Sequence, residues 1–147
     1  MKTRPFEQLW QVRRLVEDLI RRDLTNRTAE LGRLEKAAER QQTLALASRR
    51  EVLEGLGESG EPKDWLLGLA DADILEWRSE RLRGHAEAEK PKVAAARDEL
   101  LERRRERLQA ETLVEAARRA DERERERREQ QRTDDWFQGR TKRGDPE

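Results

Sequence analysis

The sequence GLGESGEPKD, residues 55–64, decides the fold because it is the clearest interruption between two long segments of helix-forming residues. It contains three glycines and one proline, the residues that most often interrupt regular structure. Gly57 is predicted to end the first helix with a left-handed cap. Pro62 and Asp64 suit the first turn of a second helix, where a missing N–H does no harm and a carboxylate meets the positive end of the helix dipole. The chain is therefore predicted to turn here.

The segment upstream of this turn is predicted to form a helix over about residues 6–54. Its apolar residues recur at alternating spacings of three and four, which is typical of a coiled-coil stripe. The stripe is predicted to change register between Leu19 and Leu24, and polar residues such as Gln41 and Ser48 at seam positions indicate loose packing in places. The first phase consists of Leu9, Val12, Val16 and Leu19, and the second of Leu24, Thr28, Leu31, Leu34, Ala38, Ala45 and Val52.

The segment downstream is predicted to form a second helix over about residues 64–135, with a tail at 138–147. Pro91 interrupts it, because proline inside a helix removes one backbone hydrogen bond and crowds the preceding turn at a cost of about 3 kcal/mol. We expect a kink or short break there; the alternative is that Pro91 lies in the first turn of a third helix. The apolar positions include Trp65, Leu66, Leu69, Ile74, Trp77, Leu82, Val93, Ala96, Leu100, Leu108, Leu113 and Ala117.

Two long helices joined by a short loop are expected to run antiparallel. The predicted fold is therefore all-α: residues 1–147 form a single long antiparallel two-helix coiled-coil hairpin. If the first helix pairs back along the second from the loop, Phe6 lies near residue 114, and everything after about Ala120 overhangs as a single helix. Such an overhang explains the polar run DERERERREQQRT that begins at Asp121, in which Glu124 can pair with Arg127 or Arg128.

Two large aromatic residues, Trp136 and Phe137, follow this polar run. On an uncovered helix they leave apolar surface in water unless something else covers them, and burial of the Trp can contribute about 2–3 kcal/mol. Trp is also strongly enriched among the residues that dominate binding energy. We expect the pair to anchor a partner; the alternatives are docking onto a nearby groove of the same chain and an exposed chain end.

Composition limits the class of protein. Of the 147 residues, 45% are charged and 33% hydrophobic, which argues against a thick globular core and favours long helices with a narrow apolar seam. Lys plus Arg number 33, as do Asp plus Glu, so no net field draws the chain to nucleic acid or to an anionic membrane. With no cysteine, no leader-like N-terminus and no apolar run of about 18 residues, we expect a cytoplasmic protein without membrane insertion, whose partners are proteins.

A search for chemistry finds little. His85 is the only histidine, no serine lies in a nucleophile elbow, and no phosphate-binding loop of the G-x-x-x-x-G-K-[ST] type is present. We therefore expect no enzyme activity, no catalytic residue, no metal site and no cofactor. Basic clusters occur at 102–108 (ERRRERL) and 123–129 (RERERRE), but interleaved Glu cancels their field and no leucine zipper follows the second.

The N-terminal segment RPFEQLWQVRRLVED, residues 4–18, resembles the opening of the FliJ/YscO family, coiled-coil stalk proteins of bacterial flagellar and type III secretion export machines. Members commonly open with an aromatic residue, two spacers and Leu, then a basic residue and an acid further on. The residues that fill this pattern are Phe6, Leu9, Arg13 and Glu17.

The C-terminal segment EQQRTDDWFQGR, residues 129–140, is similar to the family's far end, where an acid, Gln and a basic residue precede an acidic pair and an aromatic. The basic Arg140 falls one position later than in the family. The middle of the chain, roughly 25–115, matches only in pattern. The residues that match at the C-terminal end are Glu129, Gln130, Arg132, Asp134, Asp135 and Trp136.

The resemblance implies a mechanical role beside a membrane-embedded secretion apparatus. Family members look like the central shaft of rotary ATPases: their joined chain ends enter the hexameric secretion ATPase and stimulate hydrolysis, and the hairpin end faces the membrane export gate. Some relatives also bind secretion chaperones, which the residues here leave open. The implied ATPase-binding residues are Phe6, Leu9, Arg13, Asp134, Asp135, Trp136 and Phe137; the implied gate-facing residues are Trp65, Leu66, Leu69, Ile74 and Trp77. For that second set, packing of the hairpin tip is the alternative.

Two other classes remain open on the residues alone: a homo-oligomeric coiled-coil scaffold or adaptor, and a nucleic-acid-binding helical protein. A stalk is expected to be a monomer when free and to need residues 130–147. A scaffold is expected to be a stable elongated oligomer that functions without them. A nucleic-acid binder is expected to lose its ligand steeply as salt rises.

Overall fold

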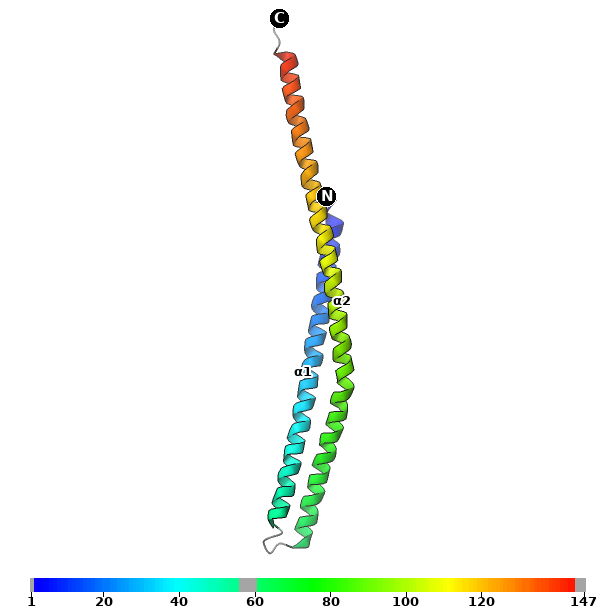
Figure 1. Ribbon diagram of the computed structural model, residues 1–147, viewed down its shortest axis with the longest axis vertical. Coiled ribbons are helices and arrows are strands. Elements are labelled where there is room, and N and C mark those ends of the chain that lie inside the picture. Colours follow the sequence, from blue (N-terminus) through cyan, green and yellow to red (C-terminus); the bar gives the residue numbers. More distant parts are fainter. Residues whose placement is uncertain (1, 56–60, 145–147) are drawn as a thin grey trace. The chain divides into compact units, whose positions relative to one another are not determined.

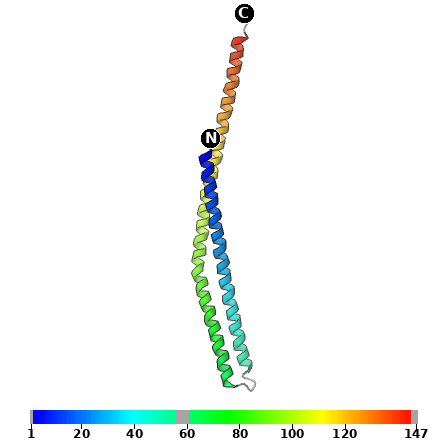
Figure 2. The same ribbon diagram turned by 180° about the vertical axis from the view of Figure 1, so that it is seen from behind.

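The computed structural model describes residues 2–55 and 61–144, and none of them forms a strand. The fold consists of two long helices that pack against each other as in a helical hairpin, α1 (Arg4–Gly55) and α2 (Pro62–Arg143), seen side by side in Figures 1 and 2. The predicted all-α fold is confirmed. Pro62 begins α2 and Asp64 lies in its first turn, as predicted. The predicted cap at Gly57 lies outside the described residues.

The chain divides into two units, each of which contains part of both helices. The hairpin unit spans Ile20–Leu100. The terminal unit combines Met1–Leu19 with Leu101–Glu147. The two units differ in the chemistry of the seam between α1 and α2, so they are described separately.

In the hairpin unit the buried residues of the seam are mostly small, and most of them are spaced seven residues apart along each helix. On α2, Ala72, Ser79 and Ala86 are buried, and small residues at such positions allow two helix backbones to approach closely. The Ser79 hydroxyl donates a hydrogen bond of 2.9 Å to the carbonyl oxygen of Ala38 on α1, which satisfies a buried polar group across the seam. The remaining buried members of this seam are Ala45, Val52, Val93 and Ala96.

Gly68 is required by the same close approach. A Cβ at this position would collide with the side chain of Val52, whereas Gly84 on the same helix has open space where a Cβ would lie. The predicted polar seam residues Gln41 and Ser48 are half-buried, and the Gln41 Oε1 atom is buried with no hydrogen-bond partner among the described residues. This part of the seam therefore contains a buried polar atom without a hydrogen bond to the described residues, while the predicted loose packing stays a prediction.

Pro91 neither breaks nor ends α2, which runs without interruption from Pro62 to Arg143. The predicted short break and the alternative of a third helix are therefore wrong, and the predicted kink stays a prediction. Pro91 lies on the exposed side of the helix, while Val93 and Ala96 just after it are buried in the seam, and their packing offsets the lost hydrogen bond. The helix also continues beyond residue 135, into the segment that was expected to be a tail.

In the terminal unit the seam differs from the predicted one. Trp10 is half-buried and Glu17 buried, whereas Leu9, Val12 and Leu19 are 38%, 56% and 61% exposed. The prediction is therefore wrong for Leu9, Val12 and Leu19, whereas Val16, the fourth residue of the predicted first phase, is half-buried. In the terminal unit the observed seam residues Thr3, Trp10 and Glu17 are spaced by seven. The half-buried Leu24, which belongs to the hairpin unit, continues this spacing along α1, so the predicted change of register does not occur either. Charged residues occupy seam positions here, and a search for apolar periodicity passes over them.

Among the described residues, no helix combines the length and the apolar character needed to cross a membrane.

Candidate partner-binding site

The seam of the terminal unit combines the buried apolar residues Ala110 and Val114 of α2 with charged residues. Glu17 is only 2% exposed, and its carboxylate accepts a hydrogen bond from Arg107 Nε on α2. Arg107 also donates to Glu111 over 3.2 Å. A buried carboxylate is tolerable only when a partner compensates for its lost hydration, and the Arg107 guanidinium does so here. This pair fixes which residues of α1 and α2 face each other.

A second cluster lies beside the first. Glu106 accepts hydrogen bonds from Arg13 on α1 and from Arg103 on its own helix, the latter over 3.1 Å. The hydrogen bond from Arg103, followed by the hydrogen bond and charge of Arg13, holds the pKa of Glu106 below its usual value of about 4.5. The implied ATPase-binding residue Arg13 is thus half-buried and engaged within the chain.

More exposed ion pairs follow toward the start of α1. Glu7 pairs with Arg118 over 3.2 Å, and Lys2 with Glu124 over 3.7 Å. Exposed pairs of this kind contribute little stability, generally under about 1 kcal/mol each. These pairs also show the order of pairing. The residue nearer the chain start, Lys2, pairs with the residue further along α2, Glu124.

Trp136 and Phe137 lie near the end of α2 with their rings 5.1 Å apart in an edge-to-face arrangement, at an interplanar angle of 77°. They are 56% and 57% exposed. The guanidinium of Arg140 lies over the Trp136 ring, 5.0 Å from its centroid. Neither aromatic is docked onto a groove of the chain, which removes that alternative and leaves an exposed aromatic pair beside the exposed Asp134 and Asp135.

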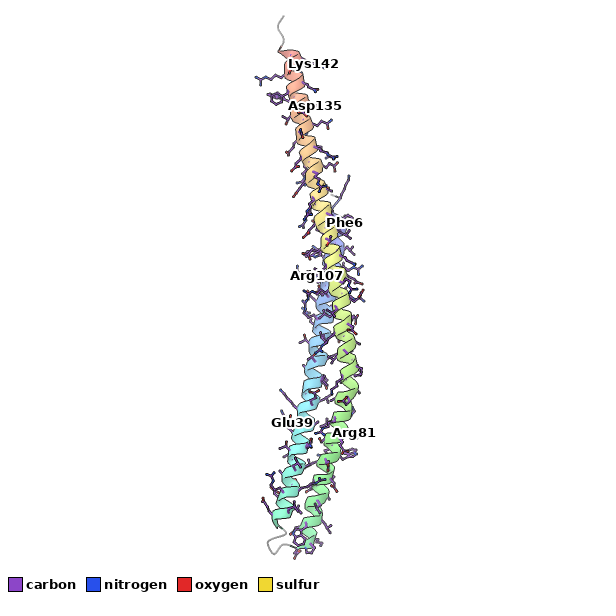
Figure 3. All side chains as sticks on the ribbon, in the orientation of Figure 1. Phe6, Glu39, Arg81, Arg107, Asp135 and Lys142 are labelled. Atoms are coloured by element: carbon purple, nitrogen blue, oxygen red, sulfur yellow. The ribbon has the colours of Figure 1, made fainter. Side chains whose placement is uncertain are left out.

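The structure does not bring the two halves of the implied ATPase-binding set into one site. Phe6 and Leu9 lie in the first turns of α1, at the limit between half-buried and exposed. Lys2, still nearer the chain start, pairs with Glu124, and Asp134 lies about 15 Å beyond Glu124 at a rise of about 1.5 Å per residue. Figure 3 shows this separation within the terminal unit, with Phe6 beside α2 and Asp135 further along α2. Any partner that contacts both sets must span this distance.

The implied gate-facing residues lie in the hairpin unit at the start of α2. Leu66, Leu69 and Ile74 are exposed, so they do not pack the hairpin tip. Trp77 is also exposed, with the Arg81 guanidinium over its ring at 5.2 Å from the centroid. Only Trp65 is half-buried and matches the packing alternative.

Sequence reasoning missed the surface role of one set of residues on α1. Leu9, Val12, Leu15, Val16 and Leu19 form a stripe at coiled-coil spacing that does not belong to the seam with α2; we call it the outer stripe. Its apolar spacing was visible in the sequence but was assigned to the intrachain seam. Arg13 and Glu17 lie four residues apart, one helical turn, and recognising them as seam residues would have corrected the assignment.

His85 is exposed, and no group of three or more His, Cys, Asp or Glu side chains that could hold a metal ion occurs in residues 2–55 and 61–144. The arrangement described above consists of exposed apolar and aromatic surfaces, which suit binding of other proteins.

No family model, curated protein or solved structure matches the chain. The resemblance to the FliJ/YscO family therefore depends on the two terminal motifs.

Proposed function

We propose that this chain is a stalk component of a bacterial type III secretion machine, of the injectisome or flagellar kind, and that it binds the hexameric secretion ATPase. In this proposal α1 and α2 form an antiparallel coiled coil, and the last part of α2 overhangs as a single helix. The observation that carries the proposal is the exposed pair Trp136 and Phe137 within the C-terminal segment that resembles the family.

The overhang is supported by exposure and by the ion pairs. Lys2, near the chain start, pairs with Glu124, and from Arg125 to Gly144 every residue except the half-buried Gly139 is exposed. An uncovered helix that carries Arg and Glu together with two aromatics offers both apolar and polar contacts to a partner. The antiparallel coiled coil is supported by the opposite order of the ion-paired residues on α1 and α2.

In the proposed mechanism, binding of the stalk is coupled to the conformational states of the ATPase subunits, and the stalk itself catalyses no reaction. A chain of zero formal net charge with a mixed Arg and Glu surface can sit within a ring of ATPase subunits through many weak contacts without a single frozen orientation. Contacts that differ between the open and closed subunit states would bias which subunits close. The exposed Leu66, Leu69, Ile74 and Trp77 are the surface proposed to face the cytoplasmic part of the export gate, and secretion chaperones are a further proposed class of partner.

The test is turnover of the cognate secretion ATPase in a titration with the intact chain, with Trp136→Ala and with Leu113→Ala. Leu113 is an exposed apolar residue of the same helix and unit, so it controls for loss of apolar surface elsewhere. We expect the intact chain and Leu113→Ala to raise turnover and Trp136→Ala to do so at least about tenfold less efficiently, because a buried Trp anchor contributes about 2 kcal/mol or more. Turnover that does not change across the titration of the intact chain would rule out the stalk proposal.

A homo-oligomeric scaffold is the second candidate function, and the outer stripe is the observation that favours it. A scaffold would remain oligomeric and functional without residues 130–147. Nucleic-acid binding is the third, weaker candidate; recovery of RNA that is lost at high salt, and no ATPase, would favour it.

A further inference from the structure

The outer stripe is an apolar surface that the chain itself leaves uncovered. Leu9, Val12, Leu15 and Leu19 are 38%, 56%, 64% and 61% exposed, and Val16 is half-buried. At about 100° per residue, Trp10 and Glu17 lie well round the helix from Val12, Leu15 and Leu19. Leu9 and Val16 form the edge of the stripe that borders the seam. Apolar residues at alternating spacings of three and four are a surface that another helix can pack against.

We propose that a second copy of this chain covers the outer stripe, in an antiparallel dimer with its twofold axis close to residue 14. This inference goes beyond the proposed stalk function and does not depend on it.

Four of the five stripe residues are spaced symmetrically about residue 14, so a second copy in antiparallel orientation presents a matching stripe, while the mirror position of Leu15 is Arg13. Leu9 and Leu19 lie at equal distances on either side of residue 14, and so do Val12 and Val16. A twofold axis there places Leu9 of one copy against Leu19 of the other, and Val12 against Val16. A twofold interface uses the same patch on both copies, which these four symmetrically spaced residues supply without any other sequence.

The residues beside these paired Leu and Val side chains are also compatible with a second copy. Leu15 lies next to the axis and meets its own counterpart, adding apolar area at the centre. Arg13 also lies close to the axis, where two like charges approach, but each Arg13 is already paired with Glu106 of its own copy. The zero formal net charge of the chain adds no long-range repulsion between copies.

The apolar area buried between the two copies limits the affinity of the dimer. Burial of Leu and Val side chains removes on the order of 60–120 Å² of apolar surface each, so five residues from each copy remove on the order of 600–1,200 Å² in total. A specific interface needs about 1,000 Å², which places this dimer at the weak end of the range. It should therefore form with rising concentration and dissociate on dilution, and the outer stripe should be free in dilute solution.

Cysteine cross-linking tests both the dimer and its direction, because the chain has no cysteine of its own. In the proposed dimer the Leu15→Cys variant should form a disulfide-linked dimer on oxidation. The Leu9→Cys and Leu19→Cys variants should not cross-link alone, since each site is about 15 Å along the axis from its own counterpart and a disulfide needs Cα atoms within about 7 Å. A mixture of these two variants should cross-link, and Leu46→Cys, at an exposed site of α1 outside the stripe, should not.

Sedimentation of the full chain gives a second readout. We expect a monomer at about 1 μM that becomes a dimer toward about 1 mM, with Val12→Glu raising the dissociation constant at least about tenfold and Leu46→Glu leaving it unchanged. Circular dichroism confirms that each variant stays helical, since both sites are exposed. A monomer at every concentration, or self-cross-linking of Leu9→Cys at the rate of Leu15→Cys, would overturn the proposal. The assay contains no ATPase, so its failure leaves the stalk function untouched.

Discussion

At the scale of single residues, Glu17 shows how the terminal unit is specified. Its buried carboxylate pairs with Arg107, and a search for apolar stripes treats both positions as surface. We expect Glu17→Ala to lower the free energy of unfolding by about 1–3 kcal/mol, because Arg107 keeps Glu111 but loses its buried partner. Glu122→Ala, at an exposed position of α2, should change it by less than about 0.5 kcal/mol. Thermal and denaturant unfolding of both variants measures the difference, and equal effects would contradict a structural role for Glu17.

Glu106 gives the terminal unit a dependence on pH. Its pKa is lowered in the folded chain by hydrogen bonds from Arg103 and Arg13, so its stabilising contribution is present above its usual pKa of about 4.5 and is lost as pH falls through the lower folded-state value. We expect unfolding temperature to fall on acidification below about pH 4.5, and Glu106→Gln to weaken that dependence. Glu122→Gln controls for loss of one carboxylate. A Glu106→Gln variant with the acid sensitivity of the intact chain would contradict this account.

At the scale of the helices, Gly68 and Gly84 form a matched pair on α2. A Cβ at Gly68 would collide with Val52 across the seam, whereas nothing lies near a Cβ at Gly84. We expect Gly84→Ala to stabilise the chain by about 0.5–1 kcal/mol through higher helix propensity, and Gly68→Ala to destabilise it by about 1–3 kcal/mol through overpacking. Chemical denaturation of both variants decides this; if both were stabilised, the helices would not be closely packed at Val52.

The same helices show how far the sequence determines the fold. The two-helix architecture and the start of α2 at Pro62 were predictable, because glycine and proline interrupt helices by known backbone physics. The seam was only partly predictable. Ala72, Ser79 and Ala86 escaped notice because the larger Leu66 and Trp77 dominate the apolar pattern of α2 although both are exposed. In the terminal unit, the pair Glu17 and Arg107 occupies seam positions beside the buried Ala110 and Val114, and local sequence patterns do not report such a pair.

The candidate binding residues were predictable to a different extent. Exposure of Trp136 and Phe137 followed from the long polar run before them, since no seam pattern continues there. The engagement of Arg13 by Glu106 did not, because the two residues are distant in the sequence and either could have faced solvent. The outer stripe was visible as a pattern in the sequence. Whether it faces α2 or lies on the surface was not predictable, since an apolar stripe does not reveal which helix it faces.

At the scale of the whole molecule, the proposed anchor Trp136 and Phe137 lies in a part of α2 that contributes little buried surface. From Arg125 to Gly144 the residues are exposed, apart from the half-buried Gly139, so a chain that ends at Arg132 loses almost no buried surface. We expect its unfolding temperature to stay within about 2 °C of the full chain, because a change of 1 kcal/mol shifts unfolding by about 4–8 °C in a domain of 60–100 residues and by less in longer ones.

The truncated chain should nevertheless lose stimulation of the secretion ATPase, because it lacks Trp136 and Phe137. Differential scanning calorimetry and the ATPase titration, made on the same preparations, separate the two effects. A chain that is equally stable and still stimulates the ATPase would show that the aromatic pair is not the anchor. A marked loss of stability would show instead that the last turns of α2 contribute to folding, and the exposure of that segment would then need another explanation.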